Sequence, residues 1–195
     1  MNIWKVKPDV SNYMWISFSE TDKMDCLQFS HLLSNKGQRV TLDEEVKFHY
    51  QEDNNNKIGD IMRASSTYWF ANEKAQKLIS SEYGEIFQFI PTICENEPDT
   101  NYYIMLPLAF CEALDMDKSI YECYKYGNII QSISQYCFNK EAYKSPFFLL
   151  KQGDYYHYGG GFYSNDEFKY FIEKNNITGL KFTKIFEFED LKLMK

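Results

Sequence analysis

The sequence predicts an α+β fold, in which a mostly antiparallel sheet is combined with a few helices in two related strand–helix–strand units. Short runs rich in aromatic and β-branched residues alternate with turn signals, which is typical of antiparallel strands. Two of these runs lead directly into an amphipathic helix that ends near a glycine and is followed by another strand. With 195 residues, the chain suits one domain, 1–195, that buries its core without disulfides or metals.

The N-terminal region predicts a strand, a helix and a second strand. Residues 13–19 (YMWISFS) have the aromatic and β-branched content of a strand. Residues 25–37 place leucines and a phenylalanine near helical spacing and end at Gly37, a stop signal. Residues 40–50 again have strand character. The polar loop at 51–60 is too short to link two domains.

The first strand–helix–strand copy lies in 66–91. An aromatic strand leads into Asn72, which is expected to cap the helix because its side-chain oxygen can accept a backbone N–H. Gly84 is expected to end the helix, and a strand follows at 86–90. The expected apolar face of the helix consists of Ala75, Leu78 and Ile79.

The second copy lies in 160–185, and its helix follows that of the first by about 93 residues. Ser164 and Glu167 have the spacing of a capping box, Gly179 is the stop signal, and a strand follows at 180–185. The expected apolar face consists of Phe168, Phe171 and Ile172. Two copies are too few for a solenoid, so the pattern predicts two related halves that share one core.

Residues 119–143, between the copies, allow two interpretations. Isoleucines and other apolar residues at 129–137 fit one face of a helix. However, Gly127-Asn128 is a turn signal, and a glycine at the centre of a helix costs ~1 kcal/mol. A β-hairpin is therefore the preferred interpretation, followed by a short strand at 146–150.

The charge and hydropathy of the chain exclude two classes of partner. The net charge is −7 at pH 7, and the only arginines are Arg39 and Arg63. A nucleic-acid partner is therefore not expected, because a binding face must neutralise phosphates with Lys and Arg. The N-terminus lacks a signal-peptide pattern, and no run approaches the roughly 18 apolar residues of a membrane span. A cytoplasmic protein with no membrane partner is expected.

The segment 154–168 (DYYHYGGGFYSNDEF) contains three consecutive glycines before a helix. Such a loop can bind phosphate when backbone N–H groups and the positive end of the helix face the anion. Here Asp166 and Glu167 occupy the first turn and would repel phosphate, and the glycine spacing matches neither phosphate-binding pattern. The glycines are therefore expected to form a turn or the start of a strand.

No set of residues predicts a catalytic, metal-binding or cofactor-binding site. The five cysteines are widely spaced, none is in a recognisable nucleophile context beside a histidine, and none matches a zinc pattern. Asp115, Asp117 and Ser119 begin like a calcium loop, but the required glycine and final glutamate are missing. A turn or cap is the preferred interpretation. The remaining acidic clusters, at 44–45 and 95–99, are typical of solvated surfaces.

Several short motifs, in their order along the chain, resemble an immunity-protein family of bacterial polymorphic toxin systems. This family was first catalogued as a domain of unknown function, of the myxobacterial immunity type. The motifs are Gly59-Asp60, the ALD sequence at 113–115 with Ser119 after it, the glycine-containing hairpin, and a capped helix followed by ITGLKFTKI at 177–185. The resemblance covers roughly residues 40 to 190. It implies an immunity-like core at 41–190, with 1–40 as an N-terminal extension packed on it.

The resemblance implies a non-enzymatic antidote that binds a cognate toxin domain in the cytoplasm. An acidic, tyrosine-rich surface would suit a basic toxin, although the charge is equally consistent with a role in solubility alone. The expected partner-binding residues are Tyr155, Tyr156, His157, Tyr158, Glu95, Glu97 and Asp99. Two other classes remain open: a small-molecule-binding or regulatory module with an aromatic pocket, lined by Tyr155, Tyr156, Tyr158 and Phe162, and an enzyme that uses Cys and His.

Overall fold

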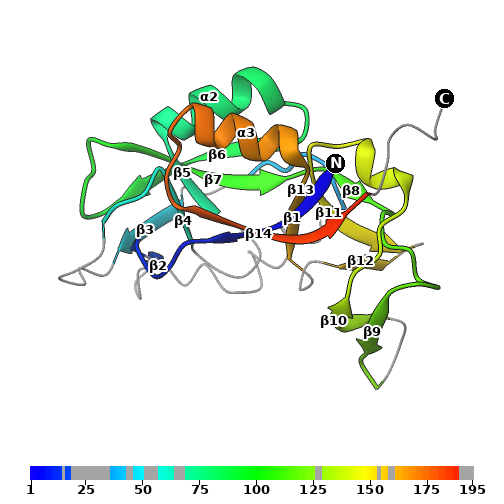
Figure 1. Cartoon of the computed structure of the whole chain (residues 1–195). Helices are drawn as coiled ribbons and strands as arrows, with labels where there is room; N and C mark the ends of the chain where they lie inside the picture. Colours follow the sequence, from blue (N-terminus) through cyan, green and yellow to red (C-terminus); the bar gives the residue numbers. More distant parts are fainter. Residues whose placement is uncertain are drawn as a thin grey trace. The chain divides into compact units, whose positions relative to one another are not determined.

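The computed structural model describes residues 1–14, 16–18, 36–42, 46–50, 57–63, 69–125, 129–152, 155–157 and 161–188. The chain divides into two compact units, each built from a sheet and a helix (Figure 1). The first unit combines Met1–Lys7, Ala109–Lys174 and Phe182–Lys195. The second unit combines Pro8–Leu108 with Asn175–Lys181.

The second unit contains a six-stranded sheet in the order β2-β3-β6-β7-β5-β4. All neighbouring strands are antiparallel except β3 and β6, which are parallel. The long β6–β7 hairpin forms the centre of the sheet. The strands are β2 (Ile16–Phe18), β3 (Val46–Tyr50), β4 (Ile61–Arg63), β5 (Trp69–Asn72), β6 (Phe87–Cys94) and β7 (Asn101–Pro107).

Both faces of this sheet are buried at its centre. Helix α2 (Glu73–Tyr83) buries Ala75, Ile79 and Tyr83 and packs against β5, β6 and β7. Alternate strand residues on one face, including Phe48, Phe70 and Ile104, form one hydrophobic cluster, against which Met14, Val40 and Leu42 pack. The residues between them, such as Trp69, Phe87 and Met105, are also almost fully buried.

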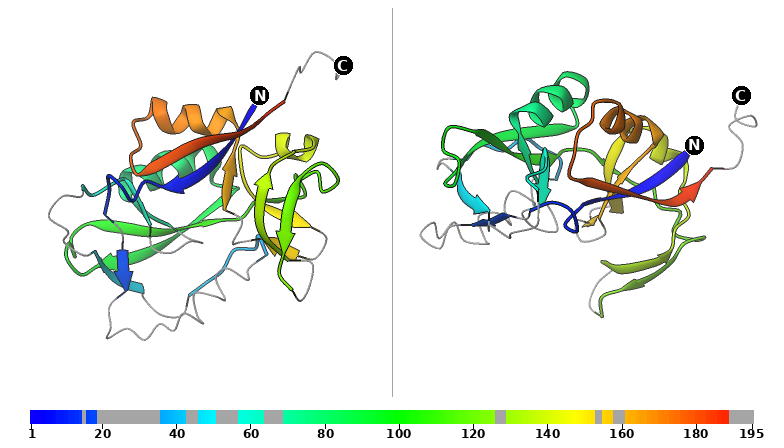
Figure 2. Two further views of the ribbon diagram at one scale, coloured as in Figure 1. Left: turned by 60° about the horizontal axis from the view of Figure 1, so that its bottom comes forward. Right: turned by 60° about the vertical axis from the view of Figure 1, so that its left-hand side comes forward.

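The first unit contains a second sheet in the order β12-β11-β13-β1-β14, with β8 parallel to β11. Helix α3 (Asp166–Lys174) lies along this sheet, and the hairpin β9–β10 projects from the unit (Figures 1 and 2). The rings of Phe138, Phe148 and Tyr163 meet in its core. The strands are β1 (Asn2–Pro8), β8 (Phe110–Cys111), β9 (Ile120–Cys123), β10 (Ile130–Gln135), β11 (Phe147–Gln152), β12 (Tyr155–His157), β13 (Phe162–Ser164) and β14 (Leu180–Glu187), and a 3-10 helix, η1, spans Lys140–Tyr143.

The two helices occupy equivalent positions in the two sheets. In the second unit, the strands before and after α2 are separated by β7, which gives the order β5-β7-β6. In the first unit, the strands before and after α3 are separated by β1, which gives β13-β1-β14. The middle strand of the first copy, β7, follows α2 in the chain. The middle strand of the second copy, β1, comes from the N-terminus. The two units thus share one arrangement of strands and differ in where the chain supplies the middle strand.

The predicted α+β fold, with its two related strand–helix–strand units, is therefore confirmed. The β-hairpin interpretation of 119–143 is also confirmed, because β9 and β10 pair antiparallel; its turn, 126–128, lies outside the described residues. Most of the helix expected at 25–37 likewise lies outside them. The expectation of a single domain stays a prediction. So does the role of 1–40 as an extension, although β1 pairs with β13 inside the first sheet.

Two local predictions were wrong. Residues 40–42 are not part of the strand expected at 40–50, because the backbone of Val40 is hydrogen-bonded by the side chain of Gln88 and not by a neighbouring strand. The cap of α3 is Asn165, not Ser164, and its Oδ1 accepts from the amides of Glu167 and Phe168. Ser164 is still the last residue of β13, where it pairs with Trp4, so the cap falls one residue later than expected.

Candidate functional site

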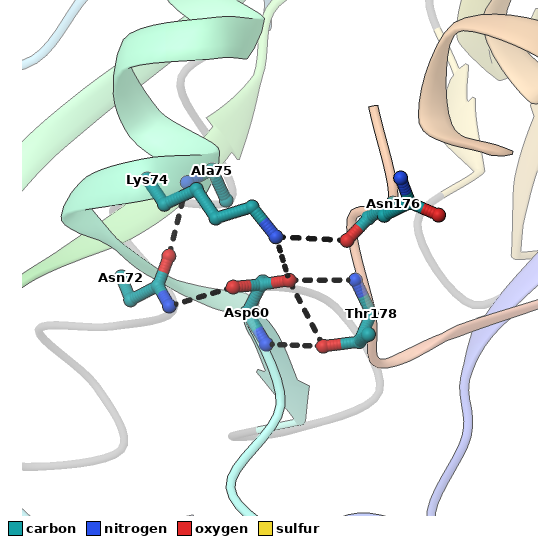
Figure 3. Close-up of polar contacts among 6 residues, drawn as sticks. All are labelled: Asp60, Asn72, Lys74, Ala75, Asn176 and Thr178. Carbon is teal, nitrogen blue, oxygen red and sulfur yellow. Dashed lines mark hydrogen bonds and ion pairs between the residues drawn. The ribbon is translucent and has the colours of Figure 1, made fainter. Parts of the chain in front are cut away.

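The Gly59-Asp60 motif belongs to a network of hydrogen bonds around the Asp60 carboxylate (Figure 3). Oδ1 accepts from Asn72 Nδ2 at 2.9 Å, and Oδ2 accepts from Lys74 Nζ at 2.9 Å. Oδ2 also accepts from the Thr178 amide at 2.8 Å and the Thr178 hydroxyl at 3.0 Å. Asn72 in turn caps α2, since its Oδ1 accepts from Ala75 N at 2.9 Å. One carboxylate thereby joins β4, the start of α2 and the segment before β14.

The same bonds keep Asp60 ionised. Burial by itself raises the pKa of this carboxyl, since a charge is less well solvated there. The hydrogen bonds from the Thr178 amide, Lys74, Asn72 and the Thr178 hydroxyl outweigh burial and leave the pKa below its ordinary value. Lys74 also donates to the carbonyl of Asn176 at 2.8 Å, so its ammonium group has a second fixed partner.

Gly179, in the ITGLKFTKI motif, completes this network. Its φ of +98° is in the region that favours glycine, and a Cβ at this position would lie 1.8 Å from the carbonyl oxygen of Ile61. The close approach allows Ile61 N to donate to the carbonyl of Thr178 at 3.0 Å. Two motifs that are 118 residues apart in the chain, at Asp60 and Thr178, are therefore in direct contact. Their role is to hold the second unit together.

The motif at 113–115 with Ser119 has a similar structural role in the first unit. The Asp115 amide donates to the carbonyl of Cys137 at 2.8 Å. The Ser119 hydroxyl accepts from Cys137 N at 3.0 Å and donates to its carbonyl at 3.1 Å. The Asp115 carboxylate accepts from Lys118 Nζ at 3.0 Å. These bonds close the base of the β9–β10 hairpin, in agreement with the expected turn.

The N-terminus of α3, which follows the three glycines, is closed by β1. The Asp166 carboxylate accepts from the Asn2 amide at 2.8 Å and from the Trp4 indole Nε1 at 2.8 Å. Burial raises the pKa of Asp166, but these bonds outweigh it and hold the pKa below its ordinary value. The anion that occupies this helix end is thus a side chain of the protein itself. Gly161, with φ +103°, precedes β13, and the other two glycines lie outside the described residues.

The cysteines in the described ranges are poor candidates for nucleophiles. Cys94, Cys111, Cys123 and Cys137 are all free. Burial raises the pKa of Cys111 to about 11, and it also raises the pKa of Cys94. A thiol with a raised pKa carries little thiolate at neutral pH. Among the described side chains, no group of three or more His, Cys, Asp or Glu residues is placed to hold a metal ion.

The structure distributes the predicted partner-binding residues over both units. Glu95, Glu97 and Asp99 lie together in the turn between β6 and β7 of the second unit. Glu97 accepts from the Tyr102 hydroxyl at 2.9 Å, and Asp99 is exposed. Tyr155, Tyr156 and His157 form β12, an edge strand of the first unit's sheet, and Tyr158 lies outside the described residues.

Phe162, which was expected to line an aromatic pocket with the tyrosines, is a core residue. It is only 3% exposed, and its ring centroid lies 5.7 Å from that of Phe147. None of the helices in the described part of the chain has the length and apolar character needed to cross a bilayer.

The second unit also contains a groove that was not expected from the sequence. It has a volume of about 680 Å³ and runs along most of β6. The sequence signal that could have indicated it is Pro91, because a proline inside a strand is typical of a sheet edge. The lining residues are Val40, Thr41, Leu42, Asn101 and the β6 residues from Gln88 to Ile93.

The sequence profile of one known family, the immunity protein family (Imm11), matches residues 5–187. The chain belongs to this family. The match extends further toward the N-terminus than the resemblance at 40–190, and it includes part of β1. No curated protein matches the chain.

In this Imm11 family member, the charge is divided unequally between the two units. The second unit carries 16 Asp and Glu residues against nine Lys and Arg residues. The first unit carries 12 of each. The whole net charge of −7 therefore belongs to the second unit, which also contains the acidic turn and the groove.

Proposed function

We propose that this protein is an antidote that binds a cognate bacterial toxin domain in the cytoplasm and neutralises it. The observation that carries the proposal is the match to an immunity protein family over residues 5–187, which leaves only the two ends of the chain unmatched. The antidote acts by binding and not by chemistry. Its target is a protein domain of a polymorphic toxin system.

The way in which the motif residues are used supports a binding role. Asp60, Thr178 and Ser119 are engaged in hydrogen bonds within the protein, and Gly179 is required by a close backbone contact. These residues therefore maintain the fold. In the proposed antidote, the fold is the part that family members share, and other surface residues select the toxin.

Two sets of residues are proposed to contact the toxin: the acidic turn of the second unit (Glu95, Glu97 and Asp99) and the tyrosine-bearing strand β12 of the first unit. The acidic turn suits a toxin with a basic surface, since complementary charge speeds association. The tyrosines would supply large contact areas at low entropic cost. The proposal also includes His157 and Tyr158, which the sequence analysis named with these tyrosines.

A growth assay tests the proposal. The toxin domain encoded next to this protein is expressed from an inducible promoter, with this protein or with an empty vector. We expect the toxin domain alone to stop growth and co-expression to restore it. If growth is not restored while both proteins accumulate in soluble form, the proposed function is wrong.

A further inference from the structure

The β9–β10 hairpin projects from the first unit and carries exposed apolar side chains (Figures 1 and 2). Of the 13 described residues between Ile120 and Gln135, ten are exposed. Three of the six large hydrophobic side chains that are exposed in the described part of the chain lie on it: Ile120 is 58% exposed, Tyr124 53% and Ile129 42%. Single exposed apolar residues are ordinary on a protein surface, but a group of them is typical of an interaction site.

The pairing of the two strands places these three residues on one face. Tyr121 pairs with Ile133, and both side chains pack against the hydrophobic core of the unit. Because side chains alternate along a strand, Ile120 and Tyr124 lie on the opposite face from Tyr121. Tyr124 N donates to the carbonyl of Ile129 at 3.0 Å, which brings Ile129 opposite Tyr124 and onto the same face. We call Ile120, Tyr124 and Ile129 the outer face of the hairpin.

The hairpin is fixed at its base, so the outer face is presented in one orientation. A two-stranded hairpin is only marginally stable in water by itself. Here Ile130 is buried in the core cluster, and the Ser119 hydroxyl bonds to both backbone groups of Cys137 across the base. A partner that binds a face already held in place loses less conformational entropy than one that must order it.

The charge of the hairpin indicates the chemistry of its partner. The only charged residues among the described ones between Ile120 and Gln135 are Glu122 and Lys125, so the hairpin is neutral in a protein of net charge −7. Glu122 already accepts from the Ser132 hydroxyl at 3.2 Å across the strands. A charged surface brought against the outer face would lose its water and find no opposite charge there. The matching surface is therefore apolar and uncharged.

The size of the hairpin favours a different protein over a second copy as the occupant. Two strands of six residues form a face of roughly 20 Å by 10 Å, or about 200 Å². A stable dimer buries about 800 Å² on each partner, and a two-fold axis through this face would bring the hairpin only against its own equivalent. The register shifts in β10 also hinder edge-to-edge pairing of two copies. A larger partner can instead enclose the projecting hairpin.

We propose that the outer face of the β9–β10 hairpin inserts into an apolar, uncharged recess of the toxin domain. The inference rests on the proposed antidote function and adds a third contact to the two sets of residues proposed above. The apolar contact slows dissociation of the complex, whereas the acidic turn speeds its association. The two contributions can therefore be separated by kinetics.

Two triple variants with matched side chains test the contact. Ile120→Ala, Tyr124→Ala and Ile129→Ala together remove the outer face. The control removes Val10, Ile58 and Tyr170, which are 43%, 40% and 64% exposed and lie elsewhere on the protein. Affinity for a catalytically inactivated form of the neighbouring toxin domain is measured by surface plasmon resonance, after circular dichroism has shown that both variants are folded.

We expect the outer-face variant to bind at least about 30-fold more weakly than the wild type, with most of the change in the dissociation rate. The control should bind within about threefold of the wild type. Because the outer face is uncharged, the 30-fold ratio should change less than about twofold between low and high salt. Equal affinities of the two folded variants would overturn the inference, and so would a ratio that disappears at high salt.

Hydrogen exchange in the wild-type protein provides a test without substitutions. The amides of β9 and β10 are expected to exchange more slowly in the complex than in the free protein. If they exchange at the same rate in both, the hairpin is not enclosed and the inference is wrong.

Two further outcomes separate this inference from its alternatives. If light scattering shows that the free protein is a dimer, and the outer-face variant is a monomer, the face binds a second copy and the inference is wrong. If the wild type does not bind the toxin domain, the proposed function fails as well. If the wild type binds and the outer-face variant binds equally tightly, only this inference fails.

Discussion

Replacing Asp60 by alanine removes the group that joins three segments of the second unit. Asp60 is only 9% exposed, and its carboxylate accepts hydrogen bonds from Asn72, Lys74 and Thr178. In Asp60→Ala, the Thr178 amide and Asn72 Nδ2 lose their acceptor. Lys74 loses an ion pair, but its side chain is 46% exposed and can be solvated by water.

The expected loss of stability follows from these contacts. A hydrogen bond to a charged group contributes about 1.5–3 kcal/mol, and two such bonds to partly buried donors are lost. The exposed Lys74 adds little. We therefore expect the free energy of unfolding to fall by about 3–6 kcal/mol, which is a large part of the 5–15 kcal/mol of a typical domain.

Urea denaturation followed by tryptophan fluorescence measures this change. With a denaturant slope of about 2 kcal/mol per molar urea, the midpoint of unfolding should fall by about 1.5–3 M. Asp99→Ala is the control, because Asp99 is an exposed acidic residue of the same unit, and we expect it to change stability by less than about 0.5 kcal/mol. The reasoning is refuted if Asp60→Ala is no more destabilising than Asp99→Ala.

Three further predictions concern pH, glycine and the tyrosine strand. The pKa of Asp60 is lowered in the folded state from its ordinary 3.8, so the contribution of its charge to stability is complete above that value and is lost as the pH falls below it. The stability difference between the wild type and Asp60→Asn should therefore shrink in acid. A difference that grows in acid would contradict the assignment. Gly179→Ala should lower the free energy of unfolding by about 3 kcal/mol or more, because the new Cβ meets a backbone carbonyl. Gly161→Ala should lower it by about 1 kcal/mol, because its Cβ meets only the flexible side chain of Lys5. Equal losses in urea denaturation would exclude the close contact at Gly179. The double variant Tyr156→Ala with Tyr158→Ala should weaken toxin binding by about 2 kcal/mol, or about 30-fold. The control, Tyr170→Ala, changes an exposed tyrosine and should have little effect. Unchanged affinity of the folded double variant would remove β12 from the interface.

Features determined by neighbouring residues could be predicted from the sequence. Asn72 caps α2 as expected, because the cap depends only on the next three residues. The hairpin of β9 and β10 was likewise indicated by a local turn signal. The predicted cap of α3 was wrong by only one residue, and the reason is a contact with a distant part of the chain. Ser164 pairs with Trp4, so β13 extends further than its own sequence indicates.

Contacts between distant segments could not be predicted in this way. The placement of β1 between β13 and β14 depends on packing between the two ends of the chain. The contact of Asp60 with Thr178 spans 118 residues, and nothing near either residue identifies the other as its partner. The parallel pairing of β3 with β6, in which Val46 lies opposite Thr92, likewise joins two strands whose own sequences do not identify each other as neighbours.

The affinity of the purified protein for the toxin domain tests the antidote function most directly. Isothermal titration of the inactivated toxin domain should show one-to-one binding with a Kd of about 10⁻⁸ M or tighter, because an antidote must occupy nearly all of its toxin at cellular concentrations. The binding should weaken as salt is raised, since the second unit carries the whole net charge of −7. If the two folded proteins show no binding at about 10⁻⁵ M, this protein is not the antidote of that toxin.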